Sequence, residues 1–166
     1  NPEKYFENNI KAFINILEFK KEKKIKKCYF ASSSSVYGDQ KKFPAKETTD
    51  LKEKNIYGFS KRINEVTAKF YSKLYNIELV GLRFFTVFGE WGRPDMLIFK
   101  YLKNNIEKKI FYLNANGQHF RDFTYINDVI KILVKLKSAK FNRKYSIVNI
   151  CSNKPIKVIK VIKKIN

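Results

Sequence analysis

Residues 28–38 read Cys-Tyr-Phe-Ala-Ser-Ser-Ser-Ser-Val-Tyr-Gly, and this short run decides the fold. Its first four residues are apolar enough for a buried β-strand, and the polar serines mark the strand's end. A helical apolar pattern follows over 58–75, and 78–85, Glu-Leu-Val-Gly-Leu-Arg-Phe-Phe, is again strand-like. Strand, helix and strand of these lengths form a right-handed crossover between parallel strands, so we expect an α/β sheet.

Amphipathic patterns on either side of this unit extend the expected fold. Apolar residues recur at helical spacing over 5–19, so a helix should precede the first strand. The helix over 58–75 should bury its apolar stripe, which consists of Ile63, Val66, Phe70 and Leu74. Further on we expect a loop at 89–95, a helix over 96–107, a strand at 110–113, a helix over 129–137 capped by Asn127-Asp128, a strand at 145–150 and a helix over 156–165.

Composition bounds the class of protein. With 166 residues, 44% of them hydrophobic, the chain can bury one sizeable core. Cys28 and Cys151 lie in apolar runs without metal-ligand spacing, so we expect free thiols in a reducing, cytoplasmic compartment and no metal site. The chain lacks a run of about 18 apolar residues, so we expect no membrane span within it.

A net charge of +20 raises nucleic acid as a partner, because clustered cations release phosphate counterions on binding. However, 30 of the 35 basic residues are lysines, whereas bidentate recognition of phosphates and bases favours arginine. The pattern is typical of a solvated lysine coat. We therefore expect neither a nucleic-acid partner nor a membrane partner for these residues.

Tyr57-Gly-Phe-Ser-Lys61 is the sharpest chemical signal. Residues four apart share one face of a helix, which puts the Lys61 ammonium beside the Tyr57 phenol. A free phenol has a pKa near ~10, so it needs a nearby cation to act as a base near neutral pH. Taken alone, the same spacing also fits a surface tyrosine packed on a lysine stem.

Hydroxyl groups gather where the two predicted strands end. Residues 32–35 are serines that follow the first strand, and Thr86 follows the second. In open α/β sheets, ligands bind beyond the carboxyl ends of the strands. The serines should therefore line a ligand site together with Tyr57 and Lys61.

Four ordered motifs resemble one family. They are Ser-Ser-Ser-Ser-Val-Tyr-Gly at 32–38, Tyr-x-x-x-Lys at 57–61, Arg-Phe-Phe-Thr-Val-Phe-Gly-x-Trp-Gly-Arg-Pro-Asp-Met at 83–96, and Arg-Asp-Phe-Thr-Tyr-Ile-x-Asp at 121–128. Together they resemble the extended short-chain dehydrogenases/reductases of the NAD-dependent epimerase/dehydratase family, and most closely the UDP-glucuronate 4-epimerases. The resemblance runs through nearly the whole chain.

This resemblance implies a Rossmann-like parallel sheet with helices on both faces, whose first strands lie upstream of Asn1. Residues 1–85 would be the C-terminal half of the NAD-binding domain, 86–120 part of a smaller substrate-binding region, 121–151 a return to the Rossmann domain, and 152–166 the start of a truncated C-terminal region. The glycine-rich turn that holds the pyrophosphate would also lie upstream. We therefore expect a piece of a longer enzyme that is inactive by itself.

The resemblance also assigns roles around the cofactor, NAD. Tyr57 would take the proton from the sugar's 4-hydroxyl, and Lys61 would stabilise the phenolate and hold the nicotinamide ribose. Ser33 would hydrogen-bond the reacting oxygen. Ser32 and Phe84 would be further cofactor contacts. The 4-keto sugar would then turn over and take the hydride back on its other face, which recycles NAD.

Substrate contacts follow from the same resemblance. The residues expected to contact the sugar and its carboxylate are Ser34, Ser35, Thr86 and Arg93. Arg121 would grip the UDP diphosphate with its forked donors, although a salt bridge to Asp122 or Asp128 is an alternative. Asn9 matches a family asparagine near the active site, or else caps or packs. Glu90 and Leu113 depart from the usual proline and uracil-stacking aromatic, which leaves the nucleotide open.

Serines at 34 and 35 occupy the stretch where related dehydratases and decarboxylases carry an acidic residue. This favours 4-epimerisation of UDP-glucuronate to UDP-galacturonate. Another nucleotide-sugar epimerase, such as one acting on UDP-glucose, or a dehydratase of the same family is the alternative reaction. An inactive fragment or basic binding module is the alternative class. We expect the full-length enzyme to be a homodimer packed through 3–19 and 58–75.

Overall fold

The computed structural model of the chain describes residues 1–40 and 43–165 and divides into two compact units. Unit 1 comprises Asn1–Phe84 and Ser138–Ile150, and unit 2 comprises Phe85–Lys137 and Cys151–Asn166. A compact unit is defined by its contacts, whereas a domain is defined by independent folding. The domain boundaries at 85, 120 and 151 therefore stay predictions.

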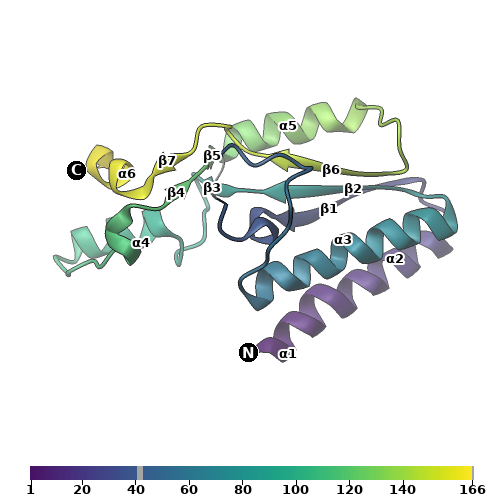
Figure 1. Cartoon of the computed structure of the whole chain (residues 1–166), viewed down its shortest axis with the longest axis horizontal. Helices are drawn as coiled ribbons and strands as arrows, with labels where there is room; N and C mark the ends of the chain where they lie inside the picture. The colour runs from purple at the N-terminus through teal and green to yellow at the C-terminus, as the bar shows by residue number, and fades with distance from the viewer. Residues whose placement is uncertain (41–42, 166) are drawn as a thin grey trace. The chain divides into compact units, whose positions relative to one another are not determined.

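Unit 1 is built on a parallel sheet. Its strands are β1 (Lys27–Ser33), β2 (Glu78–Phe84) and β6 (Tyr145–Ile150), in the order β1-β2-β6 (Figure 1). Helix α3 (Ile56–Tyr75) connects β1 to β2, which is the predicted crossover. The predicted α/β class is therefore confirmed.

The carboxyl edge of this sheet lies where the three strands end together. Ser33 pairs with Phe84, and Phe84 pairs in turn with Ile150. The central strand β2 is the most deeply buried, since Leu79 and Val80 have no exposed surface. Residues that follow the strands on this edge are consequently held on a rigid base.

The helices of unit 1 pack along one face of the sheet. The first is a continuous rod of α1 (Pro2–Tyr5), the π-helix η1 (Phe6–Lys11) and α2 (Ala12–Glu22), and Figure 1 shows α2 and α3 side by side. The apolar core between these helices and the sheet consists of Phe13, Leu17, Phe30, Ala68 and Leu79. The helical pattern predicted the rod but not its π-helical part, because a single widened turn barely changes the apolar spacing.

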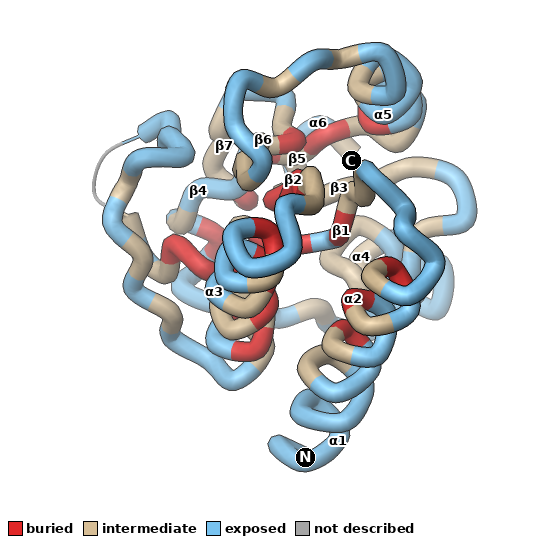
Figure 2. The backbone as a smooth tube through the Cα atoms, turned by 90° about the vertical axis from the view of Figure 1, so that its right-hand side faces the viewer, coloured by how far each residue is buried: buried red, intermediate tan, exposed pale blue. Residues whose placement is uncertain are grey.

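The face that α3 buries differs from the prediction. Val66, Phe70 and Leu74 are 53%, 63% and 57% exposed, and Figure 2 shows buried, intermediate and exposed residues along α3. The buried positions are instead small or polar: Gly58, Ser60, Asn64, Glu65, Ala68 and Ser72. Apolar periodicity identifies an apolar stripe on a helix but not the element that covers it. The prediction that this stripe faces the core is therefore wrong for Val66, Phe70 and Leu74. On the sheet side, close packing and hydrogen bonding select small and polar side chains.

Among its described residues, unit 2 contains two short sheets, three α-helices and the 3₁₀-helix η3 (Asn114–Gly117). The strand β3 (Thr86–Phe88) pairs in parallel with β5 (Phe123–Tyr125), and β4 (Phe120–Arg121) pairs antiparallel with β7 (Ile156–Lys157). The helices are α4 (Leu97–Ile106), α5 (Ile126–Ser138) and α6 (Val158–Ile165).

Two local predictions in unit 2 are wrong. Residues 110–113 form no strand, and Ile110 and Tyr112 are mostly exposed, because an apolar run without a neighbouring strand has no ladder to join. Asn127 and Asp128 do not cap α5 but lie in its first turn, since the helix starts directly after β5. An acidic residue there still interacts favourably with the helix dipole.

Candidate active site

Tyr57 and Lys61 lie in the first two turns of α3. The helix begins after Asn55, whose side-chain oxygen accepts a hydrogen bond from the Gly58 amide at 2.7 Å. The Lys61 Nζ atom is 5.9 Å from the centroid of the Tyr57 ring. The ammonium and the phenol therefore share one face of the helix, as their spacing requires.

Lys61 also connects this face to the end of β1. Its Nζ donates to the carbonyl oxygen of Ala31 at 3.1 Å, two residues before Ser33. Burial lowers the pKa of the Lys61 ammonium from its usual value. An ammonium has three N–H donors, and this bond uses one, so further donors can serve a ligand.

The serines form a tight turn at the same edge. The serine turn, residues 33–37, consists of Ser33 and the 3₁₀-helix η2 (Ser34–Tyr37). The Ser33 hydroxyl caps η2 by accepting from the Ser35 amide at 3.1 Å, and the two hydroxyl oxygens are 3.2 Å apart. A Cβ atom at Gly58 would lie 2.6 Å from the Ser35 carbonyl oxygen, so the start of α3 packs directly on the serine turn.

A buried polar network that was not among the sequence-based predictions lies beneath the serine turn. The Glu65 carboxylate has no exposed surface and accepts from the Ser32 hydroxyl at 2.6 Å. Arg83 donates to both oxygens of Glu65, each at 2.8 Å. Burial alone lowers the pKa of Arg83, but the bonds and charge of Glu65 outweigh it and raise the pKa. Since the Ser32 hydroxyl is already bonded here, its contact with the cofactor stays a prediction.

Tyr37 extends this network to β6. Its hydroxyl accepts from Arg83 at 2.8 Å and donates to the Asn149 side-chain oxygen at 2.8 Å. Burial raises the pKa of the Tyr37 phenol and outweighs the opposing effect of Arg83, so the phenol keeps its proton. A signal was present in the sequence, because Arg83 interrupts an apolar strand and Glu65 lies four residues after Lys61.

The first helix contacts the other side of Tyr57. Asn9, in η1, donates to the Ser60 hydroxyl at 2.9 Å, and Ser60 donates to the Tyr57 carbonyl oxygen at 2.8 Å. The ring of Tyr5 lies 6.1 Å from the ring of Tyr57. Asn9 thus packs beside the start of α3 through Ser60.

The remaining predicted contacts belong to unit 2. Thr86 starts β3, Arg93 is exposed and forms a bidentate pair with Asp95, and Arg121 is exposed and donates to the Phe120 carbonyl oxygen. The proposed salt-bridge partners of Arg121 are engaged elsewhere, since Asp122 accepts from the Ser152 and Lys154 amides and Asp128 pairs with Lys131. The placement of Thr86, Arg93 and Arg121 beside the serine turn stays a prediction.

Glu90 has a clear partner in unit 2. The Tyr125 hydroxyl lies 2.8 Å and 3.0 Å from its two carboxylate oxygens. Backbone and Tyr125 hydrogen bonds lower the pKa of this carboxyl, so Glu90 is charged at neutral pH. His119 precedes β4, and burial together with the Arg121 charge lowers its pKa. In the described part of the chain, three or more His, Cys, Asp or Glu side chains do not gather as potential metal ligands.

Comparisons with known proteins identify the family. Residues 1–151 match the NAD dependent epimerase/dehydratase family, and the chain belongs to it. An uncharacterized protein of Methanocaldococcus jannaschii is 42% identical over 160 residues, covering 96% of this chain and 48% of the relative. UDP-glucuronate 4-epimerase 5 of Arabidopsis thaliana is 42% identical over 137 residues, covering 79% and 31%. The chain thus spans about half the length, or less, of these curated relatives.

A solved structure supports the same family. UDP-glucuronic acid 4-epimerase from Bacillus cereus, in complex with UDP-glucuronic acid and NAD, has a TM-score of 0.87 and 32% identity to this chain. The match covers 93% of this chain and 49% of that chain. The family is NAD-dependent. The Lys61 ammonium is partly buried, and its hydrogen bond to the Ala31 carbonyl oxygen leaves N–H donors of the kind that could bind the hydroxyl groups of such a cofactor.

We predict that Gly58→Ala destabilises the protein although alanine is the better helix former. Helix propensity favours alanine by about 1 kcal/mol, whereas a methyl group forced against the Ser35 carbonyl costs about 1–3 kcal/mol. Urea unfolding of the full-length protein should show a net loss of stability. Lys69→Ala, at an exposed position of the same helix, is the control and should change stability by less than about 0.5 kcal/mol. A gain in stability for Gly58→Ala would mean that α3 does not press on the serine turn.

Proposed function

We propose that the protein containing this chain is an NAD-dependent UDP-sugar 4-epimerase, and that it converts UDP-glucuronate to UDP-galacturonate. The observation that carries the proposal is the contact between the start of α3, which carries Tyr57 and Lys61, and the segment that carries Ser33. The Tyr57 phenol has the Lys61 ammonium beside it, and Lys61 and Gly58 both contact the segment that carries Ser33. A base, a cation that favours its charged form and a facing hydroxyl are what removal of a proton from an alcohol requires.

Tyr57 accepts the proton of the sugar's 4-hydroxyl, and the Lys61 charge stabilises the phenolate that does so. Ser33 hydrogen-bonds the same oxygen and keeps it in line with the phenol. NAD, when bound, would supply the hydride acceptor for carbon 4 of the sugar. The 4-keto sugar presents its other face before the hydride returns, and Tyr57 gives back the proton.

The substrate contacts in this proposal are those that the family resemblance assigns. Ser34 and Ser35 hydrogen-bond the sugar, and Thr86 and Arg93 bind its carboxylate. For this contact Arg93 gives up its hydrogen bonds to Asp95. Arg121, whose guanidinium is exposed, binds the diphosphate. UDP-glucuronate is the first choice because the named plant and Bacillus relatives act on or bind it. UDP-glucose is the second choice, since Glu90 and Leu113 depart from the usual pattern.

The direct test follows the reaction of the full-length protein with NAD and UDP-glucuronate by proton NMR. We expect UDP-galacturonate to accumulate. Tyr57→Phe should lower the rate by about 10²–10⁴-fold, because the acid/base is lost. Tyr71→Phe is the matched control, since the Tyr71 hydroxyl, on the same helix, bonds to Glu18 away from the serine turn, and it should retain activity. Turnover of UDP-glucose in place of UDP-glucuronate would reject the substrate, and full activity of Tyr57→Phe would reject the mechanism.

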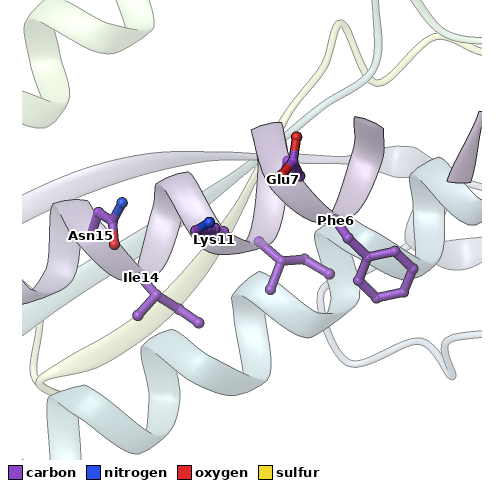
Figure 3. A pocket seen from close by; sticks show the side chains of 6 residues that line it. Phe6, Glu7, Lys11, Ile14 and Asn15 are labelled. Atoms are coloured by element: carbon purple, nitrogen blue, oxygen red, sulfur yellow. The ribbon is translucent and has the colours of Figure 1, made fainter. Parts of the chain in front are cut away.

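We also propose that the full-length protein is a homodimer packed through residues 3–19 of the first helical rod and residues 58–75 of α3. Support comes from apolar side chains on the outer faces of these helices, including Ile16, Phe19, Val66, Phe70 and Leu74, each more than half exposed. A groove of about 300 Å³ runs along η1 and the start of α2, where Phe6 and Ile14 point to the same side (Figure 3). Burying such surface against a second copy would release about 25 cal/mol per Å².

Sedimentation of the full-length protein at micromolar concentration should show a dimer, and Phe70→Glu should dissociate it, because a charge would be buried in the interface. Val134→Glu places the same charge on an exposed site of α5 and should leave the dimer intact. A monomeric unsubstituted protein, or a Phe70→Glu dimer of unchanged affinity, would contradict this interface.

A cytoplasmic location is the final part of the proposal. Cys28 and Cys151 are not joined in a disulfide, which suits a reducing compartment. Across residues 1–40 and 43–165, the helices are too short or too polar to cross a bilayer.

A further inference from the structure

A buried ion pair joins three elements of unit 1 beneath the proposed active site. Glu65 belongs to α3 and Arg83 to β2, and their side chains are at most 4% exposed. Arg83 donates two parallel hydrogen bonds to the Glu65 carboxylate, a geometry that fixes distance and orientation together. Its remaining terminal nitrogen donates to the Tyr37 hydroxyl, and the guanidinium lies 4.7 Å from the Tyr37 ring centroid.

This ion pair holds both ends of the serine turn. At its start, Ser32 precedes the turn and donates to Glu65. At its end, Tyr37 is bonded to Arg83 and, through its own proton, to Asn149 on β6. The Ser33 hydroxyl lies between these two anchored positions and would move if either anchor were released.

The same ion pair also fixes the helix that carries the base. Glu65 lies one turn beyond Lys61 and two turns beyond Tyr57 on α3, so its bonds to Ser32 and Arg83 set the depth of α3 against the strands. Proton transfer requires the phenol and the serine hydroxyl to reach one substrate oxygen, and errors of about 1 Å can cost 10²-fold in rate. We propose that Glu65, Arg83 and Tyr37 are positioning residues, which hold Ser33 in register with Tyr57. The inference rests on the proposed function.

The least disruptive probe is Tyr37→Phe, which removes one hydroxyl and keeps the buried ring. For the full-length protein, kcat should fall about tenfold or more, while the KM values for the UDP-sugar and NAD change less than about threefold, because alignment and not binding is lost. Tyr71→Phe is the matched control, because it also removes a partly buried hydrogen bond of a tyrosine hydroxyl in unit 1, the one to Glu18. It should leave kcat unchanged.

A double-mutant cycle separates positioning from general destabilisation. In a Ser33→Ala background, Tyr37→Phe should have little further effect on kcat, because the group it positions is already gone. Additive losses, or an unchanged kcat for Tyr37→Phe, would overturn the inference and leave the proposed function standing. Arg83→Lys is the second variant: it keeps the charge but not the fork, and it should lower kcat by a similar factor.

Hydrogen exchange gives a readout that does not depend on activity. In Tyr37→Phe, the backbone amides of the serine turn should exchange faster than in the unsubstituted protein, whereas Tyr71→Phe should leave them unchanged. If the unsubstituted protein epimerises neither UDP-glucuronate nor UDP-glucose, the proposed function fails, and this measurement still decides whether the anchors hold the turn. Unchanged exchange in Tyr37→Phe would reject the anchoring.

Discussion

Close packing of Gly58 against the Ser35 carbonyl is the contact on which the site depends. Without a Cβ at position 58, the first turn of α3 comes close enough to put Tyr57 and Lys61 beside the serine turn. The contact would be loose if α3 could shift along the sheet. Glu65 prevents this, because its carboxylate is bonded at once to a strand end and to the guanidinium of Arg83.

Burying that ion pair is costly, and its value lies in orientation more than in stability. Replacing a buried pair by apolar residues is often neutral or stabilising, whereas removing one partner leaves an uncompensated charge. Here the carboxylate accepts from Ser32 and Arg83, and Arg83 also donates to Tyr37, so the pair is bonded to both segments that flank Ser33. Exposed lysines, in contrast, are solvated and contribute little through their ion pairs. The net charge of +20 therefore says little about function.

The sequence predicted the sheet and the shared helix face of Tyr57 and Lys61, but not the ion pair that connects them. Apolar runs at 28–31 and 78–85 were sufficient for the crossover, and the spacing from Tyr57 to Lys61 was sufficient for a shared helix face. The ion pair of Glu65 and Arg83 was missed because charged residues are rarely buried, so pattern analysis assigns them to solvent. The outer stripe of α3 was assigned to the core because periodicity identifies an apolar face without identifying its partner.

The most direct test is a crystal structure of full-length Tyr57→Phe with NAD and UDP-glucuronate bound, since this variant should trap the substrate unreacted. We predict that the sugar's 4-hydroxyl oxygen lies within hydrogen-bonding distance of the Ser33 Oγ atom, about 3 Å, and faces the ring at position 57. A sugar whose 4-hydroxyl is remote from both the serine turn and the start of α3 would contradict the proposed site.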